Sequence, residues 1–203
     1  MIQRPFVMVG VMLTIILCTS CVSPVHLSIY QTETEWVDLR EWPIGYPMLS
    51  NLSHPVEIES TKLREVLQNI RYRQSELFSF HMGKQHPAFS EYQLALLAAE
   101  LRKAFGQALP EEVIAFRVRN EQTGHLYTKG FSFILEDELH LVIQELQQPD
   151  FDSPANQTRP PTVRWEFAPQ VGQHIFAPLS HSTHDFPHWI ITPIFKRSSN
   201  GML

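Results

Sequence analysis

Residues 130–146, with the sequence GFSFILEDELHLVIQEL, decide the fold that this chain can adopt. Apolar residues alternate with other residues on both sides of a polar turn, Glu136, Asp137 and Glu138. Two alternating runs joined by a short polar turn are typical of a β-hairpin. The apolar positions are Phe131, Phe133, Leu135, Leu139, Leu141 and Ile143, and the polar positions include Ser132, His140 and Gln144. We therefore expect one face of the hairpin to be buried and the other to see solvent.

Further alternating runs lie on both sides of this hairpin. They predict strands around Val56, Phe116 and Trp165 and over residues 189–195. Pro193 lies in the last of these strands and favours a position at the edge of the sheet, because proline cannot donate a backbone hydrogen bond.

Two helices are predicted upstream of most of these strands. The first is capped by Ser60, and its apolar stripe is Leu63, Val66, Leu67 and Ile70. The second begins at Ser90, which forms a capping-box pair with Gln93, and ends at Gly106 in a left-handed cap. Helices early and strands late indicate an α+β fold, an antiparallel sheet with two helices packed on one face.

The chain begins with a segment that is typical of bacterial export signals. Arg4 supplies a positive charge, residues 6–17 are mostly apolar, and Thr19 and Ser20 lead into Cys21. This order is similar to a lipobox, in which the cysteine becomes the lipidated N-terminus after cleavage. A plain cleaved signal and an uncleaved anchor are the alternatives, although residues 6–18 are shorter than the roughly 20 apolar residues that a membrane span needs.

These features divide the chain into four parts. Residues 1–20 are the signal peptide, 21–53 a lipidated extended arm, 54–196 the globular domain and 197–203 a tail, with a proline-rich loop at 147–162. The arm carries four aromatic residues, Tyr30, Trp36, Trp42 and Tyr46. Two interpretations stay open: these rings pack on the domain, or they contact a partner or the bilayer interface.

Cysteine content and charge exclude several classes of function. The two cysteines, Cys18 and Cys21, both lie in the leader, so the exported body has no thiol for a disulfide, a nucleophile or a metal site. The net charge of −5 becomes −6 when Arg4 leaves with the signal peptide. An acidic body disfavours nucleic-acid binding, which needs Lys and Arg against phosphate.

The sequence contains no recognisable catalytic motif, so we expect no enzymatic activity and no cofactor. The one chemical oddity is a group of weak candidate ligands for zinc or copper: His181, His184, Asp185 and His188. Their spacing matches no specific metal signature, and prolines make the segment loop-like. We therefore predict no tight metal site.

Several segments resemble a family of uncharacterised bacterial lipoproteins, mostly from Gram-negative organisms. The matching segments are residues 17–21 (LCTSC), 54–58 (HPVEI), 63–73, 89–105, 116–118 and 130–146. The resemblance implies export, lipidation of Cys21 and no assigned activity. Val22 after the lipidated cysteine implies the outer membrane, facing the periplasm, with the periplasmic face of the inner membrane as the alternative.

These observations predict a membrane-anchored envelope lipoprotein that acts as a non-catalytic binding or scaffolding module. Its expected partners are the membrane, through Cys21, and an envelope protein complex. The alternatives are a periplasmic carrier of a lipid or glycan and a weak metal-dependent hydrolase of the envelope. A cleft with convergent titratable groups would favour the hydrolase.

Overall fold

The structure, a computed structural model, describes residues 25–75, 82–149, 164–178 and 186–195. The predicted signal peptide, Cys21 and the tail lie outside these residues. The helices are α1 (Ser60–Gln68) and α2 (Glu91–Phe105). The strands are β1 (Val25–Gln31), β2 (Trp36–Glu41), β3 (Arg71–Ser75), β4 (Met82–Pro87), β5 (Glu112–Arg119), β6 (Leu126–Leu135), β7 (Glu138–Pro149), β8 (Trp165–Phe167), β9 (His174–Ile175) and β10 (Trp189–Pro193).

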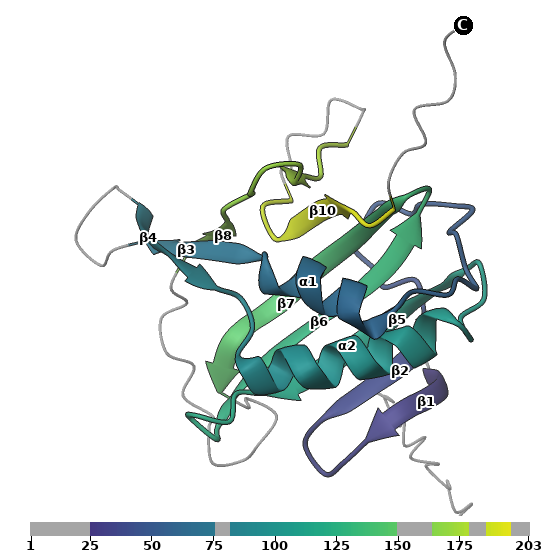
Figure 1. Ribbon diagram of the computed structural model, residues 1–203, viewed down its shortest axis with the longest axis horizontal. Coiled ribbons are helices and arrows are strands. Elements are labelled where there is room, and N and C mark those ends of the chain that lie inside the picture. Colours follow the sequence, from purple (N-terminus) through teal and green to yellow (C-terminus); the bar gives the residue numbers. More distant parts are fainter. Residues whose placement is uncertain (1–24, 76–81, 150–163, 179–185, 196–203) are drawn as a thin grey trace, which may run out of the picture.

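Two antiparallel sheets form the framework (Figure 1). The larger has seven strands in the order β1-β2-β5-β6-β7-β10-β9, and the smaller has the order β4-β3-β8. Every pair of neighbouring strands runs antiparallel, as predicted. The three-stranded sheet was not predicted as a separate layer. Pro193 does not mark an edge strand, because the two-residue strand β9 lies outside β10.

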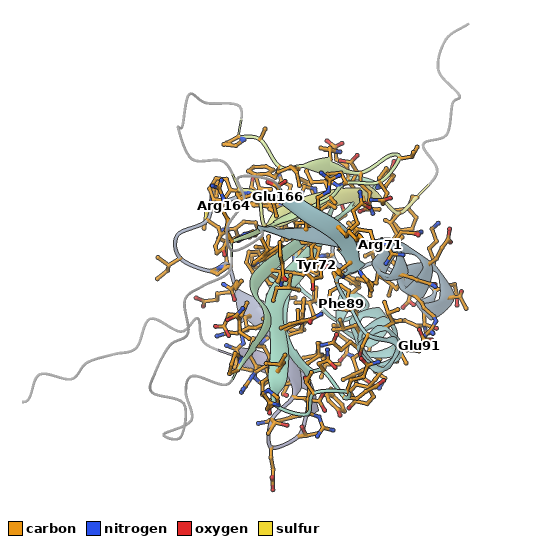
Figure 2. All side chains as sticks on the ribbon, turned by 90° about the vertical axis from the view of Figure 1, so that its left-hand side faces the viewer. Arg71, Tyr72, Phe89, Glu91, Arg164 and Glu166 are labelled. Carbon is orange, nitrogen blue, oxygen red and sulfur yellow. The ribbon has the colours of Figure 1, made fainter. Side chains whose placement is uncertain are left out.

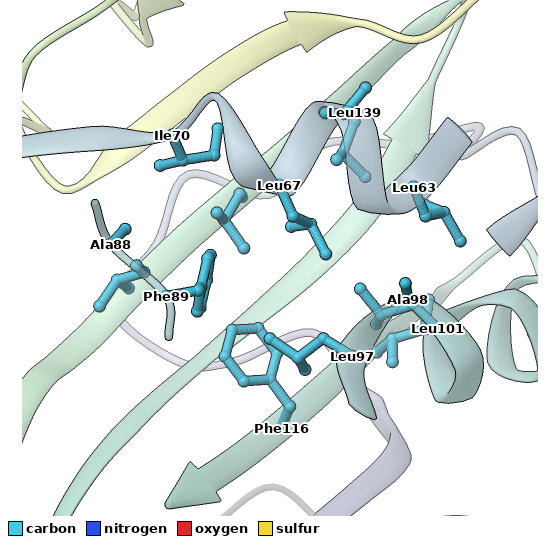
Figure 3. Close-up of a cluster of buried hydrophobic side chains, with 14 of the residues drawn as sticks. Leu63, Leu67, Ile70, Ala88, Phe89, Leu97, Ala98, Leu101, Phe116 and Leu139 are labelled. Atoms are coloured by element: carbon cyan, nitrogen blue, oxygen red, sulfur yellow. The ribbon is translucent and has the colours of Figure 1, made fainter. Parts of the chain in front are cut away.

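Both helices lie over the same face of the seven-stranded sheet, which confirms the α+β prediction (Figure 1). Leu63 and Leu67 of α1 and Leu97 of α2 are buried in one apolar cluster with Phe116 of β5 (Figure 3). The 3.6-residue period of an α-helix puts the predicted apolar positions on a single stripe. That stripe is what holds each helix to the sheet.

The observed ends of the helices match the caps predicted from the sequence only in part. The capping box of α2 is present, because Ser90 Oγ accepts from Gln93 N–H and the Gln93 side chain accepts from Ser90 N–H. Ser60 is not a cap: it is the first residue of α1, whose N-cap residue is Glu59. Gly106 has φ −73°, so the predicted left-handed cap is wrong.

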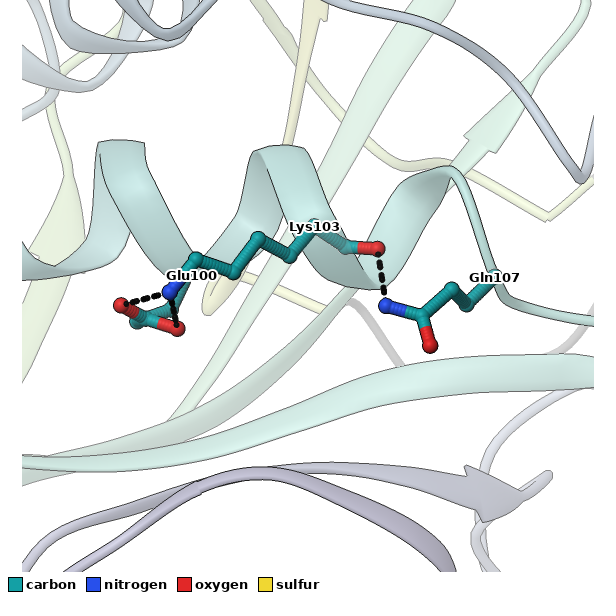
Figure 4. A network of polar contacts seen from close by, with 3 residues as sticks. All are labelled: Glu100, Lys103 and Gln107. Carbon is teal, nitrogen blue, oxygen red and sulfur yellow. Dashed lines mark hydrogen bonds and ion pairs between the residues drawn. The ribbon is translucent and has the colours of Figure 1, made fainter.

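Side chains stabilise the end of α2 in place of a glycine cap. Lys103 Nζ lies 2.8 Å from each carboxylate oxygen of the buried Glu100 (Figure 4). Gln107 Nε2 donates to the backbone carbonyl of Lys103 at 3.1 Å. These contacts neutralise a buried carboxylate and satisfy a carbonyl that no helical N–H reaches.

The β6–β7 hairpin forms, but its predicted solvent face is wrong. The turn spans two residues, with Glu136 at φ 54°, and Leu135 pairs with Glu138. Phe133 therefore shares a face with His140, and Ser132 shares the other face with Leu141. Ser132 and His140 are both buried, so both faces of the sheet are covered there, and of the three predicted polar positions only Gln144 is exposed.

Residues 25–53 are not an extended arm. Strands β1 and β2 form a hairpin, and β2 pairs with β5 along its whole length. The side chains of Val37 and Leu39 are fully buried in the core beneath the helices. In the described residues the domain therefore begins at Val25 and not at His54. Residues 56–58 form no strand and lead into α1.

Candidate functional site

Two of the four predicted contact aromatics are partly buried and pack against the protein's own core. Trp42 and Tyr46 pack on the sheet face that the helices leave open. The Trp42 ring centroid lies 5.1 Å from that of Phe133, and the Tyr46 centroid lies 4.9 Å from that of Phe131. The other two rings lie nearer the edge of the sheet. Tyr30 packs partly against the helix-side core, and the guanidinium of Arg40 lies 4.2 Å from the half-buried ring of Trp36.

Two buried histidines serve as hydrogen-bond acceptors. Trp189 Nε1 donates to His140 Nδ1 at 3.1 Å, and Ile134 N–H donates to His54 Nε2 at 3.0 Å. Burial lowers the pKa of each histidine to about 4, with a smaller contribution from His174 in the case of His140. Both rings are therefore neutral at pH 7 and have a structural role.

The candidate metal ligands are not brought together in the described part of the chain. His181, His184 and Asp185 lie outside it. His188 stacks on Trp165 with centroids 3.8 Å apart, and its Nε2 lies 2.9 Å from the Trp165 carbonyl. Among the described residues, no three His, Cys, Asp or Glu side chains are placed to hold a metal ion. No helix of this part is both long and apolar enough to cross a membrane.

The best candidate for a binding site is a polar groove of about 510 Å³. It lies between the small sheet, the start of α2 and the segments that follow β5 and end β7. Its polar lining residues include Gln68, Arg71, His86, Asn120, Gln122 and Gln147, and its apolar residues include Tyr72, Phe89 and Leu94. Figure 2 shows Arg71 and Tyr72 on β3 and, below them, Phe89 and Glu91 at the start of α2.

The groove offers one cation without an ionic partner. Arg71 is half-buried and forms no ion pair with any of the described residues. Glu91, at the start of α2, is paired with Arg64 of α1, so its charge does not neutralise Arg71. The capping box already uses the side chains of Ser90 and Gln93. Burial raises the pKa of Tyr72, whose ring lies 5.7 Å from that of His86.

This set of groups is suited to binding. Amide side chains both donate and accept hydrogen bonds, so they match hydroxyl or peptide groups, and the guanidinium matches an anionic oxygen. Among the described lining residues we find no nucleophile paired with a general base. The sequence did not reveal the groove, because its polar residues come from separate segments and match no motif.

Comparison with known proteins gives no match to a family model, a curated protein or a solved structure. The resemblance to uncharacterised lipoproteins therefore stays a prediction.

Proposed function

We propose that this protein is a membrane-tethered, non-catalytic binding protein of the bacterial envelope that holds a polar ligand in the groove. The observation that carries the proposal is the half-buried Arg71, which has no ion pair among the described residues and lies among amide side chains. A partly desolvated guanidinium is costly unless it gains a hydrogen-bonded anionic partner. A ligand with a carboxylate or phosphate group would supply one.

The rest of the lining suggests the body of the ligand. Gln68, Gln122 and Gln147 can each donate and accept, which suits the hydroxyl groups of a sugar. The buried side chains of Tyr72 and Phe89 form an apolar floor beneath these amides. A groove of this volume falls in the usual range of small-ligand sites. An acidic sugar unit of an envelope polymer combines these properties.

The tether part of the proposal comes from the leader. Cleavage before Cys21 and acylation of its sulfur would hold the domain at a membrane, with the outer membrane favoured and the inner membrane as the alternative. Several acyl chains bind a bilayer far more strongly than one. An envelope protein complex would then be the larger setting in which the domain presents its ligand.

A binding experiment tests the groove. Isothermal titration of the Cys21→Ala chain with trigalacturonic acid should give binding, and Arg71→Gln should weaken it about 10- to 100-fold through loss of a charge-assisted hydrogen bond. The matched control is Arg102→Gln, which removes an exposed cation from the last turn of α2 and should change nothing. The fully methyl-esterified trimer should bind the unaltered groove more weakly. Equal effects of the two arginine variants would contradict the proposal.

A fractionation experiment tests the tether. Cys21→Ala should block lipid attachment and release the protein or stall it in precursor form. Retention of this variant in membranes after a carbonate wash would show that the leader acts as an uncleaved anchor.

A further inference from the structure

We infer that the edge strand β1 lies against the membrane surface, so that the tethered domain has a fixed orientation. This inference rests on the lipidated Cys21 of the proposed function. It adds a second contact with the bilayer, made by the folded domain itself.

The length of the tether is the first argument. Four peptide steps separate Cys21 from Val25, the first residue of β1. Since an extended chain spans at most ~3.6 Å per residue, Val25 cannot lie more than roughly 14 Å from an acylated Cys21. That distance is about twice the roughly 5–8 Å depth of one headgroup layer. The start of β1 therefore stays close to the bilayer surface whatever path residues 22–24 take.

The chemistry of β1 is the second argument. It is an outer strand of the seven-stranded sheet, and its sequence VHLSIYQ contains no Asp, Glu, Lys or Arg. Val25 is 50% exposed and Leu27 is 41% exposed. Exposed edge strands are usually protected by charged side chains, especially lysine, and β1 has no such protection. Exposed apolar side chains on an uncharged strand beside a lipid tether are suited to the boundary between headgroups and acyl chains, where water still reaches the unpaired backbone groups of the edge.

A third exposed apolar residue lies close to the same place. The carboxylate of Glu112 accepts a hydrogen bond from Leu109 N–H at 2.8 Å and lies 2.5 Å from His26 Nδ1. This carboxylate therefore joins Leu109, which is 43% exposed, to the beginning of β1. Val25 pairs with Arg40 and Leu27 with Leu39, so the register shift between them places the two side chains on opposite faces of the edge strand, with Leu27 on the helix side. We call Val25, Leu27 and Leu109, which flank this edge, the β1 patch.

Nearby charges indicate the kind of contact. Two exposed carboxylates lie near the β1 patch, those of Glu41 and Glu111. Glu111 lies two residues after Leu109, and Glu41 pairs with Glu112, whose carboxylate binds Leu109 N–H. Carboxylates are repelled by anionic headgroups, so the contact must be apolar and not electrostatic. The side chains of the patch would enter the boundary between headgroups and acyl chains, the depth reached by other interfacial segments.

The orientation has a consequence for the groove. In Figure 1, β1 lies at the lower right, whereas β3 and β4, which line the groove, lie at the left. A domain that rests on β1 therefore directs the groove away from its own membrane.

Site-specific labelling tests the inference in the lipidated protein. A mature chain with an acylated Cys21 has no free thiol, so Leu27→Cys introduces a single labelling site. The matched control is Val171→Cys, at a fully exposed position beside β4, where Gln170 Nε2 donates to Gln85 Oε1. Each variant carries a fluorophore and is reconstituted in vesicles of phosphatidylethanolamine and phosphatidylglycerol. A quencher on the lipid chains should quench the label at 27 several-fold more than the label at 171. Iodide in the water should show the reverse order, and 0.5 M NaCl should leave both unchanged.

The outcomes separate this inference from the proposed function. Vesicle flotation with equal quenching at both positions would overturn the membrane contact and leave the tether standing. Failure to float would overturn both. Shielding of the label at 27 from iodide in an unlipidated background that carries both Cys18→Ala and Cys21→Ala, without vesicles, would show that protein covers β1 and would also overturn the inference.

Discussion

The two faces of the seven-stranded sheet are covered in different ways. On one face, two regular helices bury mostly aliphatic side chains such as Leu63, Leu97 and Ile143. On the other, irregular chain around Trp42 and Phe186 covers a cluster of rings centred on Trp189. Large rings bury much area for each residue, so a few of them on irregular chain can replace a helix.

The largest predicted effect tests whether the two faces of the sheet contribute equally to the stability of the buried core. Phe116 on the helix face and Trp189 on the aromatic face are each fully buried. Replacing either with alanine should lower the free energy of unfolding by about 3–5 kcal/mol, through lost burial and the cavity left behind. Urea denaturation followed by circular dichroism measures both variants. A loss below about 1 kcal/mol for Trp189→Ala alone would show that the aromatic face is only a loose cover.

A smaller effect distinguishes packing from partner contact among the predicted aromatics. Trp42→Ala should cost about 2–4 kcal/mol, because the Trp42 ring contacts Phe131, Phe133 and Trp189. Trp36→Ala should cost about 1 kcal/mol or less, since its half-buried ring makes a cation–π contact with Arg40. Equal, small losses in thermal unfolding would revive the interpretation of Trp42 as a contact residue for a partner.

Each face also carries one buried histidine, and these two side chains make the stability of the fold depend on pH. His54 lies on the helix side against Phe105, and His140 lies among the rings. The pKa of each falls from 6.5 to about 4 on folding, so between these values the unfolded chain binds more protons than the folded one. Stability should therefore fall as the pH drops from 7 to 5, by about 1–2 kcal/mol for each histidine.

Denaturation curves at several pH values measure this dependence. His140→Gln and His54→Gln should each remove about half of the slope, whatever their effect on absolute stability. His86→Gln, which changes an exposed ring, is the control. An unchanged slope in both buried variants would contradict the assignment.

The smallest effect concerns the helix caps. Ser90→Ala should cost about 1 kcal/mol, because it removes the acceptor for Gln93 N–H. Ser60→Ala should be nearly neutral, since Ser60 lies inside α1 and caps nothing. A larger loss at Ser60 than at Ser90 in chemical denaturation would reverse this comparison.

Sequence patterns correctly predicted the features of the helices that depend on contacts between residues close together in the chain. The helical stripe of Leu63, Val66 and Leu67 and the pair Ser90 and Gln93 were correct because their partners lie within two helical turns. Ile70 is buried as predicted but lies beyond Gln68, where α1 ends. The predicted solvent face of the hairpin was wrong because the turn has two residues and not the three that were predicted. This difference shifts the pairing by one residue, and such a shift exchanges the two faces of a strand. His140 was therefore assigned to solvent although it is buried.

Long-range pairing was not visible in the sequence. Strand β2 pairs with β5, some 75 residues later, and three prolines between residues 24 and 47 concealed the strands of the predicted arm. The groove has the same origin, since Arg71, Asn120 and Gln147 meet only after both sheets have formed. Contacts between residues so far apart in the chain leave no periodic pattern in the sequence.

The order of the strands also limits when the fold can be completed during synthesis. The centre of the sheet, β5-β6-β7, comes from the middle of the chain, but its aromatic face is covered from both ends, by Trp42 and by Trp189. A nascent chain that has reached residue 150 therefore contains the helices and Phe131 but lacks the indole that covers this ring from the far side. Until the last strand arrives, several large rings are open to water and to other chains. Such contacts of high sequence separation form slowly, so the unfinished protein should depend on a holding chaperone until its final residues emerge.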